Sequence, residues 1–174
     1  MTLPSLVRRR QSLEHGFIEA NIGEADMRTP QANYLMLPAR PSAVRSARSH
    51  VRRVLAAWGL EAMTDDVELL VSELVTNSVE ATAMNADQGA WDRLVDPPGA
   101  VYLCISMTMK STVLIEVWDS ELKPPIPINA TANDEHGRGL TLVRALSSTW
   151  GTRWPETGGK IVWCECVIAR TTSA

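Results

Sequence analysis

The segment E-L-V-T-N-S-V-E-A, residues 73–81, holds carboxylates and an amide within a run otherwise rich in valine and leucine. Glu73 and Asn77 are four residues apart, so on a helix they stand one turn above each other. Such a pair offers a carboxylate and an amide oxygen to a common point. Hard oxygen ligands of this kind suit Mg²⁺, which keeps water and phosphate oxygens in its other positions. The alternative is a merely solvated polar stripe, which the helix taken alone favours.

Asp119 is a second candidate, because it ends the apolar segment T-V-L-I-E-V-W-D at residues 112–119. An acid at a strand end beside a pocket can accept a hydrogen bond from an exocyclic amine, such as that of adenine. Aspartate is also a common strand terminator and turn former. In isolation the turn interpretation is the better one.

The third candidate is the segment E-H-G-R-G-L-T-L-V-R-A-L, in which Gly137, Arg138 and Gly139 lead into a predicted helix. Glycines at such a place let backbone N–H groups approach an anion, and the helix N-terminus adds a favourable dipole. Arg138 adds positive charge toward a phosphate. A capping turn explains the same pattern about as well.

Periodicity predicts the elements that position these residues. Pro41 suits a first helical turn and Gly59 a helix stop, while Thr64 is a suitable N-cap for the helix that carries Glu73. Alternating or short apolar runs bounded by turn residues predict strands. Helices segregated from antiparallel hairpins predict an α+β two-layer sandwich. The predicted helices are 41–59, 64–84 and 139–147, and the predicted strands are 33–37, 101–107, 112–118, 150–154 and 160–168.

The domain organisation follows from where these patterns begin and end. Residues 1–32 show no lasting period and are predicted to form a flexible extension, with one short helix around 12–20. Residues 33–170 form one predicted domain, followed by a tail at 171–174. Within the domain, 85–98 and 119–136 are predicted long loops, which in a compact domain are usually functional.

Composition excludes several classes of protein. The chain of 174 residues is 45% hydrophobic and 21% charged, as in soluble globular domains. Its net charge of −3 does not favour nucleic-acid binding, although nine arginines and four acids precede residue 61. That basic portion indicates a solvated helix face or a partner contact. Three cysteines are too few for a disulfide framework, and Cys164 and Cys166 share one strand face as core residues. We expect a cytoplasmic protein without a membrane span or secretory signal.

The order of the three candidates resembles the GHKL (Bergerat) ATP-binding fold of histidine kinases, gyrase and Hsp90. The closer resemblance is to anti-sigma regulatory factors, which are serine protein kinases. It covers residues 34–167 and rests on E-L-V-T-N-S-V, G-R-G-L-x-L-V-x-A-L and W-G…G-K-I-V-W. It implies a mostly antiparallel mixed sheet covered by three helices.

The resemblance also implies roles for individual residues. Asn77 corresponds to the Mg²⁺ ligand and Glu73 to the general base toward a protein serine. Asp119 corresponds to the contact with the adenine amino group. Gly137–Gly139, with Arg138 between the glycines and Leu140 after them, correspond to the phosphate-binding turn, and 120–136 to the ATP lid. The implied cofactors are ATP and Mg²⁺. The implied partners are a sigma factor and an antagonist protein, and a homodimer is the implied assembly.

The chain departs from the family pattern at three places. The first glycine box, usually D-x-G-x-G, is D-S-E-L-K-P-P here, and the residues after the motif asparagine include Glu80 and Ala81 instead of basic ones. The loop 85–98 is also longer than expected. These departures favour a non-catalytic binding module with the same fold as one alternative. Others are a histidine-kinase catalytic fragment, opposed because no helix with a phosphoacceptor histidine precedes residue 60, and nucleic-acid binding through the arginine-rich helix.

Overall fold

All eight predicted helices and strands are present, with bounds that shift by at most two residues. The computed structural model describes residues 32–86, 99–108, 111–125 and 139–168. The expected N-terminal extension with its short helix, the C-terminal tail, and most of the two long loops lie outside these ranges. The elements are β1 (Ala32–Pro38), α2 (Ser42–Trp58), the 3-10 helix η1 (Glu61–Met63), α3 (Thr64–Ala86), β2 (Ala100–Met107), β3 (Thr112–Asp119), α4 (Gly139–Leu146), β4 (Thr149–Arg153) and β5 (Lys160–Val167).

The strands form one five-stranded sheet in the order β1-β2-β3-β5-β4. Every neighbouring pair among the described strands is antiparallel, where a mixed, mostly antiparallel sheet was expected. The chain leaves β3, passes through α4, and then forms the β4–β5 hairpin. Because this hairpin places its second strand beside β3, β5 runs opposite to β3 and β4 becomes the edge.

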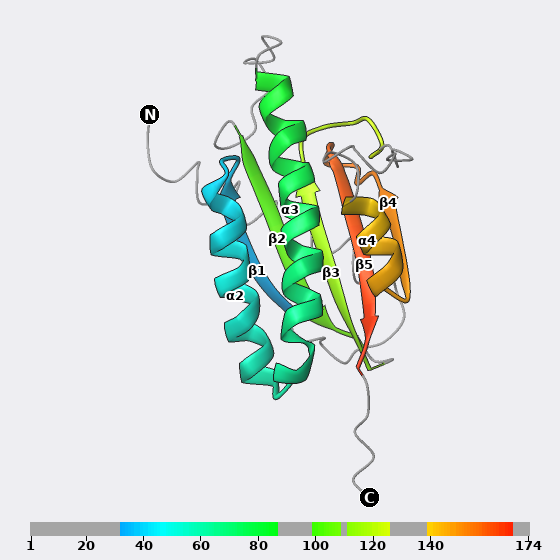
Figure 1. Ribbon diagram of the computed structural model, residues 1–174. Coiled ribbons are helices and arrows are strands. Elements are labelled where there is room, and N and C mark those ends of the chain that lie inside the picture. Colours follow the sequence, from blue (N-terminus) through cyan, green and yellow to red (C-terminus); the bar gives the residue numbers. More distant parts are fainter. Residues whose placement is uncertain (1–31, 87–98, 109–110, 126–138, 169–174) are drawn as a thin grey trace, which may run out of the picture.

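The three helices lie side by side on one face of the sheet, as Figure 1 shows, so the fold is the predicted α+β two-layer sandwich. The main core lies between the layers and is built from the apolar stripes of α2 and α3 and from alternate residues of the central strands. The fully buried members of this core include Val51, Leu55, Leu70, Leu74, Ile105, Val113, Ile115 and Val117.

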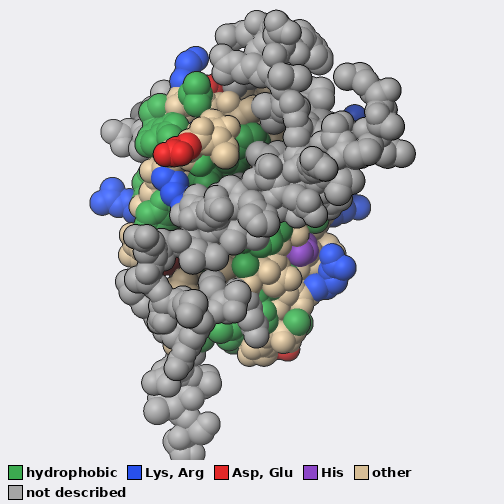
Figure 2. Space-filling view, turned by 180° about the vertical axis from the view of Figure 1, so that it is seen from behind, with side chains coloured by type: hydrophobic (Ala, Val, Ile, Leu, Met, Phe, Trp, Pro, Cys, Tyr) green, Lys and Arg blue, Asp and Glu red, His purple; other side chains and the backbone are tan. Residues whose placement is uncertain are grey.

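The opposite face of the sheet carries a second, smaller cluster of Cys104, Trp118 and Ile161, with Tyr102 in edge-to-face contact with Trp118. Figure 2, which looks onto the back of the molecule, shows hydrophobic side chains among its described residues. Cys164 and Cys166 belong to the main core on the helix side, which confirms their predicted role as small buried residues.

Ion pairs join the arginine-rich helix α2 to α3. Arg48 Nε lies 3.3 Å from a carboxylate oxygen of Glu68, and an Arg52 nitrogen lies 2.7 Å from the other. Glu68 is buried while both arginines stay largely exposed. Part of the basic surface therefore serves helix packing. None of the helices within the described residues is long and apolar enough to cross a membrane.

Candidate functional site

Helix α3 presents Glu73 and Asn77 to the first residue of α4, which is Gly139. A Cβ atom at Gly139 would lie 2.6 Å from Glu73 Oε2 and 3.4 Å from Asn77 Nδ2. The glycine therefore leaves room for the Glu73 carboxylate at its observed position, because a side chain at residue 139 would displace it. The structure brings together three of the residues that the sequence singled out, from positions more than 60 residues apart.

The carboxylate of Glu73 is half-buried, and its environment disfavours the charged form. Burial raises the pKa of Glu73 above its usual value, and the negative charge of Glu80 raises it further. Glu80 itself is exposed on the same helix. A carboxylate whose pKa is raised is a better proton acceptor near neutral pH, provided that it is ionised.

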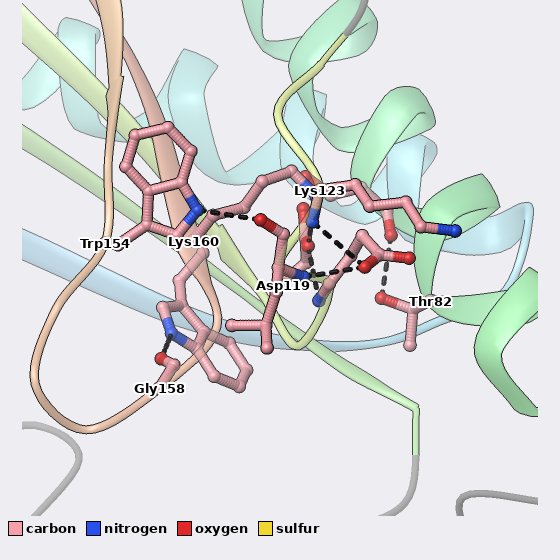
Figure 3. Close-up of polar contacts among 10 residues, drawn as sticks. Thr82, Asp119, Lys123, Trp154, Gly158 and Lys160 are labelled. Atoms are coloured by element: carbon pink, nitrogen blue, oxygen red, sulfur yellow. Dashed lines mark hydrogen bonds and ion pairs between the residues drawn. The ribbon is translucent and has the colours of Figure 1, made fainter.

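Asp119 is buried at the end of β3 and forms an ion pair with Lys160, the first residue of β5. Asp119 is 0% exposed and Lys160 is 4% exposed, and Lys160 Nζ donates to Asp119 Oδ1 at 2.7 Å. The two residues are direct partners in the antiparallel register, so their side chains leave the same face of the sheet. Figure 3 shows them pointing toward each other.

The β4–β5 turn places Lys160 through a close fit with Trp118. The Trp118 indole N–H donates to the Gly158 carbonyl at 2.9 Å. Gly159 has φ +75°, and a Cβ there would collide with the Trp118 ring and with the backbone carbonyl of Asp119. Gly159 therefore combines a left-handed backbone with a close approach that only glycine allows, whereas Gly158 is favoured by its φ of +88° alone. The G-G-K motif positions the lysine opposite Asp119.

The two oxygens of Asp119 have different surroundings. Oδ1 accepts from Lys160 and from the Glu121 backbone N–H at 2.9 Å. Oδ2 is buried without a hydrogen bond within the described residues. Burial raises the pKa of Asp119, while Lys160, the nearby Ser78 hydroxyl on α3 and the Glu121 N–H act in the opposite direction. The Ser78 hydroxyl thus lies close to Asp119 without the geometry of a hydrogen bond to Oδ2.

The chain after Asp119 turns without glycine. The Glu121 N–H bonds to Asp119 Oδ1, and the Glu121 carboxylate in turn accepts the backbone N–H groups of Leu122 and Lys123 at 2.7 and 3.0 Å. These are side-chain turns that replace the backbone freedom of glycine. The Trp154 indole N–H holds the same segment by donating to the Leu122 carbonyl at 2.9 Å (Figure 3).

These features fit a bound adenine nucleotide. Oδ2 of Asp119 is a buried acceptor that lacks a donor within the described residues, as an exocyclic amine requires. The described residues hold no cluster of three or more His, Cys, Asp or Glu side chains. Asn77 would hold Mg²⁺ here through one protein oxygen, which suits an ion that retains waters and phosphate oxygens.

The predicted site residues are only partly covered by the structure. Leu140 is 7% exposed and follows Gly139 in α4. Gly137 and Arg138, predicted for the phosphate-binding turn, lie outside the described residues. The sequence analysis missed Lys160 as the partner of Asp119. Its signal was a lysine at the start of an apolar strand, directly after two glycines.

The chain is similar to known proteins in structure and in sequence. A similar solved structure is the histidine kinase domain of the blue-light activated histidine kinase from Erythrobacter litoralis EL346. It is 18% identical, with a TM-score of 0.43, and the match covers 96% of this chain and 76% of that one. No curated protein matches the chain significantly. The family model described as histidine kinase-like ATPase domain matches residues 37–165, which is most of the chain. The chain therefore belongs to the histidine kinase-like ATPase domain family.

Proposed function

We propose that this protein is an ATP-binding regulator of the anti-sigma type, a serine protein kinase that binds a sigma factor and phosphorylates an antagonist protein. The observation that carries the nucleotide part is the buried Asp119 carboxylate, whose Oδ2 lacks a donor within the described residues. The contact of Glu73 and Asn77 with Gly139 supports the catalytic part. Family membership supports both.

Each residue has a defined role in this proposal. Asp119 accepts a hydrogen bond from the adenine amino group, and Asn77 supplies an oxygen ligand for Mg²⁺. When bound, Mg-ATP supplies the phosphoryl group and the metal charge. Glu73 accepts the proton of the attacking serine hydroxyl, a task for which its raised pKa is suited. In this proposal the N-terminal end of α4 binds phosphate, and Gly137 and Arg138, which precede α4 in the sequence, contribute to that turn.

The partner assignments rest on the anti-sigma motifs of the sequence. A sigma factor and an antagonist protein are the proposed partners, in the cytoplasm, and a homodimer is the proposed assembly. The test is co-purification with each neighbouring gene product that is a sigma factor or a small antagonist. Size-exclusion chromatography with light scattering measures the stoichiometry. A chain that binds neither class of protein would remove the regulatory part of the proposal.

Calorimetric titration with Mg-ATP tests nucleotide binding directly. We expect saturable binding by the wild type and binding by Asn77→Ala that is weaker by at least about tenfold, because loss of even an outer-shell partner of a metal ligand typically costs about 10–100-fold in affinity. Arg45→Met is the control, since Arg45 is exposed on α2, outside the elements that carry the site. The absence of binding by the wild type would refute the nucleotide proposal.

Transfer of labelled phosphate from ATP to the antagonist tests the kinase activity. Glu73→Gln keeps the shape of the side chain and removes the base, so we expect the transfer rate to fall by about 10²–10⁴-fold. Binding of Mg-ATP by this variant should stay close to that of the wild type. An unchanged transfer rate in Glu73→Gln would refute the assignment of the base.

A non-catalytic binding module is the second candidate. The glycine-free D-S-E-L-K-P-P segment and the acidic Glu80 beside the site favour it, because neither matches the usual family pattern. This candidate predicts binding of the sigma factor together with no phosphate transfer by the wild type. The two assays described above therefore separate the two candidates.

A further inference from the structure

Lys160 is a buried cation for which the proposed function so far has no role. It is 4% exposed, and its ammonium group lies 2.7 Å from Asp119 Oδ1. A lysine is almost never buried to this extent unless a carboxylate pairs with it, because removing an ammonium group from water is costly. A neutral residue of similar length would fill the same space without this cost. Packing alone therefore does not explain why a lysine pairs with Asp119 at this buried position.

The ion pair with Lys160 gives the two carboxylate oxygens of Asp119 different surroundings. Oδ1 is occupied by the Lys160 ammonium and the Glu121 N–H, whereas Oδ2 has no donor within the described residues. An ionised carboxylate can only accept hydrogen bonds. Oδ2 is thus a hydrogen-bond acceptor without a donor within the described residues, at a position that the ion pair fixes. A ligand group that pairs with it must donate a hydrogen bond.

We propose that Lys160 is the specificity-determining residue of the nucleotide site, selecting 6-aminopurine over 6-oxopurine nucleotides by holding Asp119 as a carboxylate whose Oδ2 is left to accept a hydrogen bond. The amino group of adenine donates to Oδ2. The carbonyl at the same position of hypoxanthine or guanine is an acceptor and would face another acceptor. This inference rests on the proposed nucleotide binding and adds to it the reason for base selection.

Removal of the Lys160 charge should change the protonation of Asp119, and with it whether the side chain accepts or donates a hydrogen bond. The groups that face Asp119 are Lys160 from β5, the Ser78 hydroxyl from α3 and the Glu121 backbone N–H from the following loop. Lys160 is the cation among them. Burial raises the pKa of Asp119 and Lys160 acts in the opposite direction, so removal of the cation should raise this pKa further and favour the protonated carboxyl. A protonated carboxyl carries an O–H donor and can then bond to a 6-oxo group.

The test compares ATP with inosine triphosphate, which carries oxygen in place of the amino group. Titration calorimetry with Mg²⁺ should show that the wild type binds ATP more tightly by about 10- to 100-fold, the range for a hydrogen bond to a charged group. In Lys160→Met this ratio should fall to within about threefold. Lys160→Arg, which keeps the charge, should retain the preference. Arg45→Met should also retain it, because Arg45 is an exposed cation on α2, outside the elements that carry the site.

The ratio of the two affinities distinguishes selection from a structural role. A packing defect in Lys160→Met would weaken both nucleotides equally and leave the wild-type ratio, which would overturn the inference while the proposed function stands. Failure of the wild type to bind either nucleotide would overturn both. If Lys160→Met does not fold, Lys160→Gln replaces it, because its amide can donate to Oδ1 without a charge.

A second measurement needs no nucleotide. The carboxyl carbon of Asp119, observed by NMR in protein labelled with ¹³C-aspartate, reports protonation directly. Its titration midpoint should lie at higher pH in Lys160→Met and Lys160→Gln than in the wild type and Lys160→Arg. An unchanged midpoint in the variants without a cation would overturn the inference.

Discussion

Replacing Gly139 with alanine isolates the contact between the two helices of the site. Gly139 is not among the glycines with positive φ, so its backbone accepts alanine without strain. The added methyl group would lie 2.6 Å from Glu73 Oε2. Ordinary contact begins at 3.4 Å, so the carboxylate must move by about 0.8 Å.

This displacement should affect activity far more than stability. The Glu73 carboxylate is the end of a flexible side chain and can rotate away, while alanine is a better helix former than glycine by up to about 1 kcal/mol. The free energy of unfolding should therefore change by less than about 1 kcal/mol. A shift of about 1 Å in a catalytic group can cost about a hundredfold in rate, so we expect phosphate transfer to fall by about 10- to 100-fold.

Gly59→Ala is the matched control for this experiment. Gly59 ends α2 with φ +70°, and a Cβ there meets nothing within 4 Å. Alanine at this position should cost about 1 kcal/mol of unfolding free energy, or about 2–4 °C in Tm, with no effect on transfer rate per folded molecule. The two variants thus have opposite expected profiles, measured by thermal unfolding and by phosphate transfer to the antagonist. A Gly139→Ala variant with the wild-type transfer rate would refute the placement of the base.

Three further substitutions test other contacts. Glu80→Gln removes a negative charge that raises the pKa of Glu73. Because phosphate transfer requires ionised Glu73, activity in this variant should persist to lower pH. A pH–rate profile whose acid limb does not move would contradict this. Glu68→Ala removes the shared partner of two arginines and should lower the free energy of unfolding by about 1–2 kcal/mol in urea, with smaller losses for Arg52→Ala. Gly159→Ala combines a strained backbone with a collision against Trp118 and should cost about 2–4 kcal/mol in the same assay; a loss below 1 kcal/mol would show that the turn adapts.

The elements of the fold could be predicted because each leaves a local pattern. The apolar stripe that includes Val51 and Leu55 and the alternation through Ile115 and Val117 repeat at helix and strand periods. Strand order and the fully antiparallel pairing could not be read in this way. They depend on β5 inserting beside β3, which is a contact between distant segments.

In the site, too, features with a local sequence pattern could be predicted, and contacts between distant segments could not. Glu73 and Asn77 could be paired from their spacing along one helix, and Asp119 from its place at a strand end. The contact of Gly139 with Glu73 depends on how α4 docks against α3, which has no local signature. Lys160 was overlooked because a lysine at a strand start is normally exposed, and only the cross-strand register places it against Asp119.

The position of Glu80 in the structure changes the interpretation of its charge. In the sequence, an extra acid after the motif asparagine counts against phosphate binding, because like charges repel. In the structure Glu80 is exposed, and its charge raises the pKa of Glu73. The same repulsion that opposes phosphate thus also makes Glu73 a stronger base near neutral pH. The residue that favoured a non-catalytic module is thus also compatible with a kinase, and the pH–rate profile of Glu80→Gln separates these two effects.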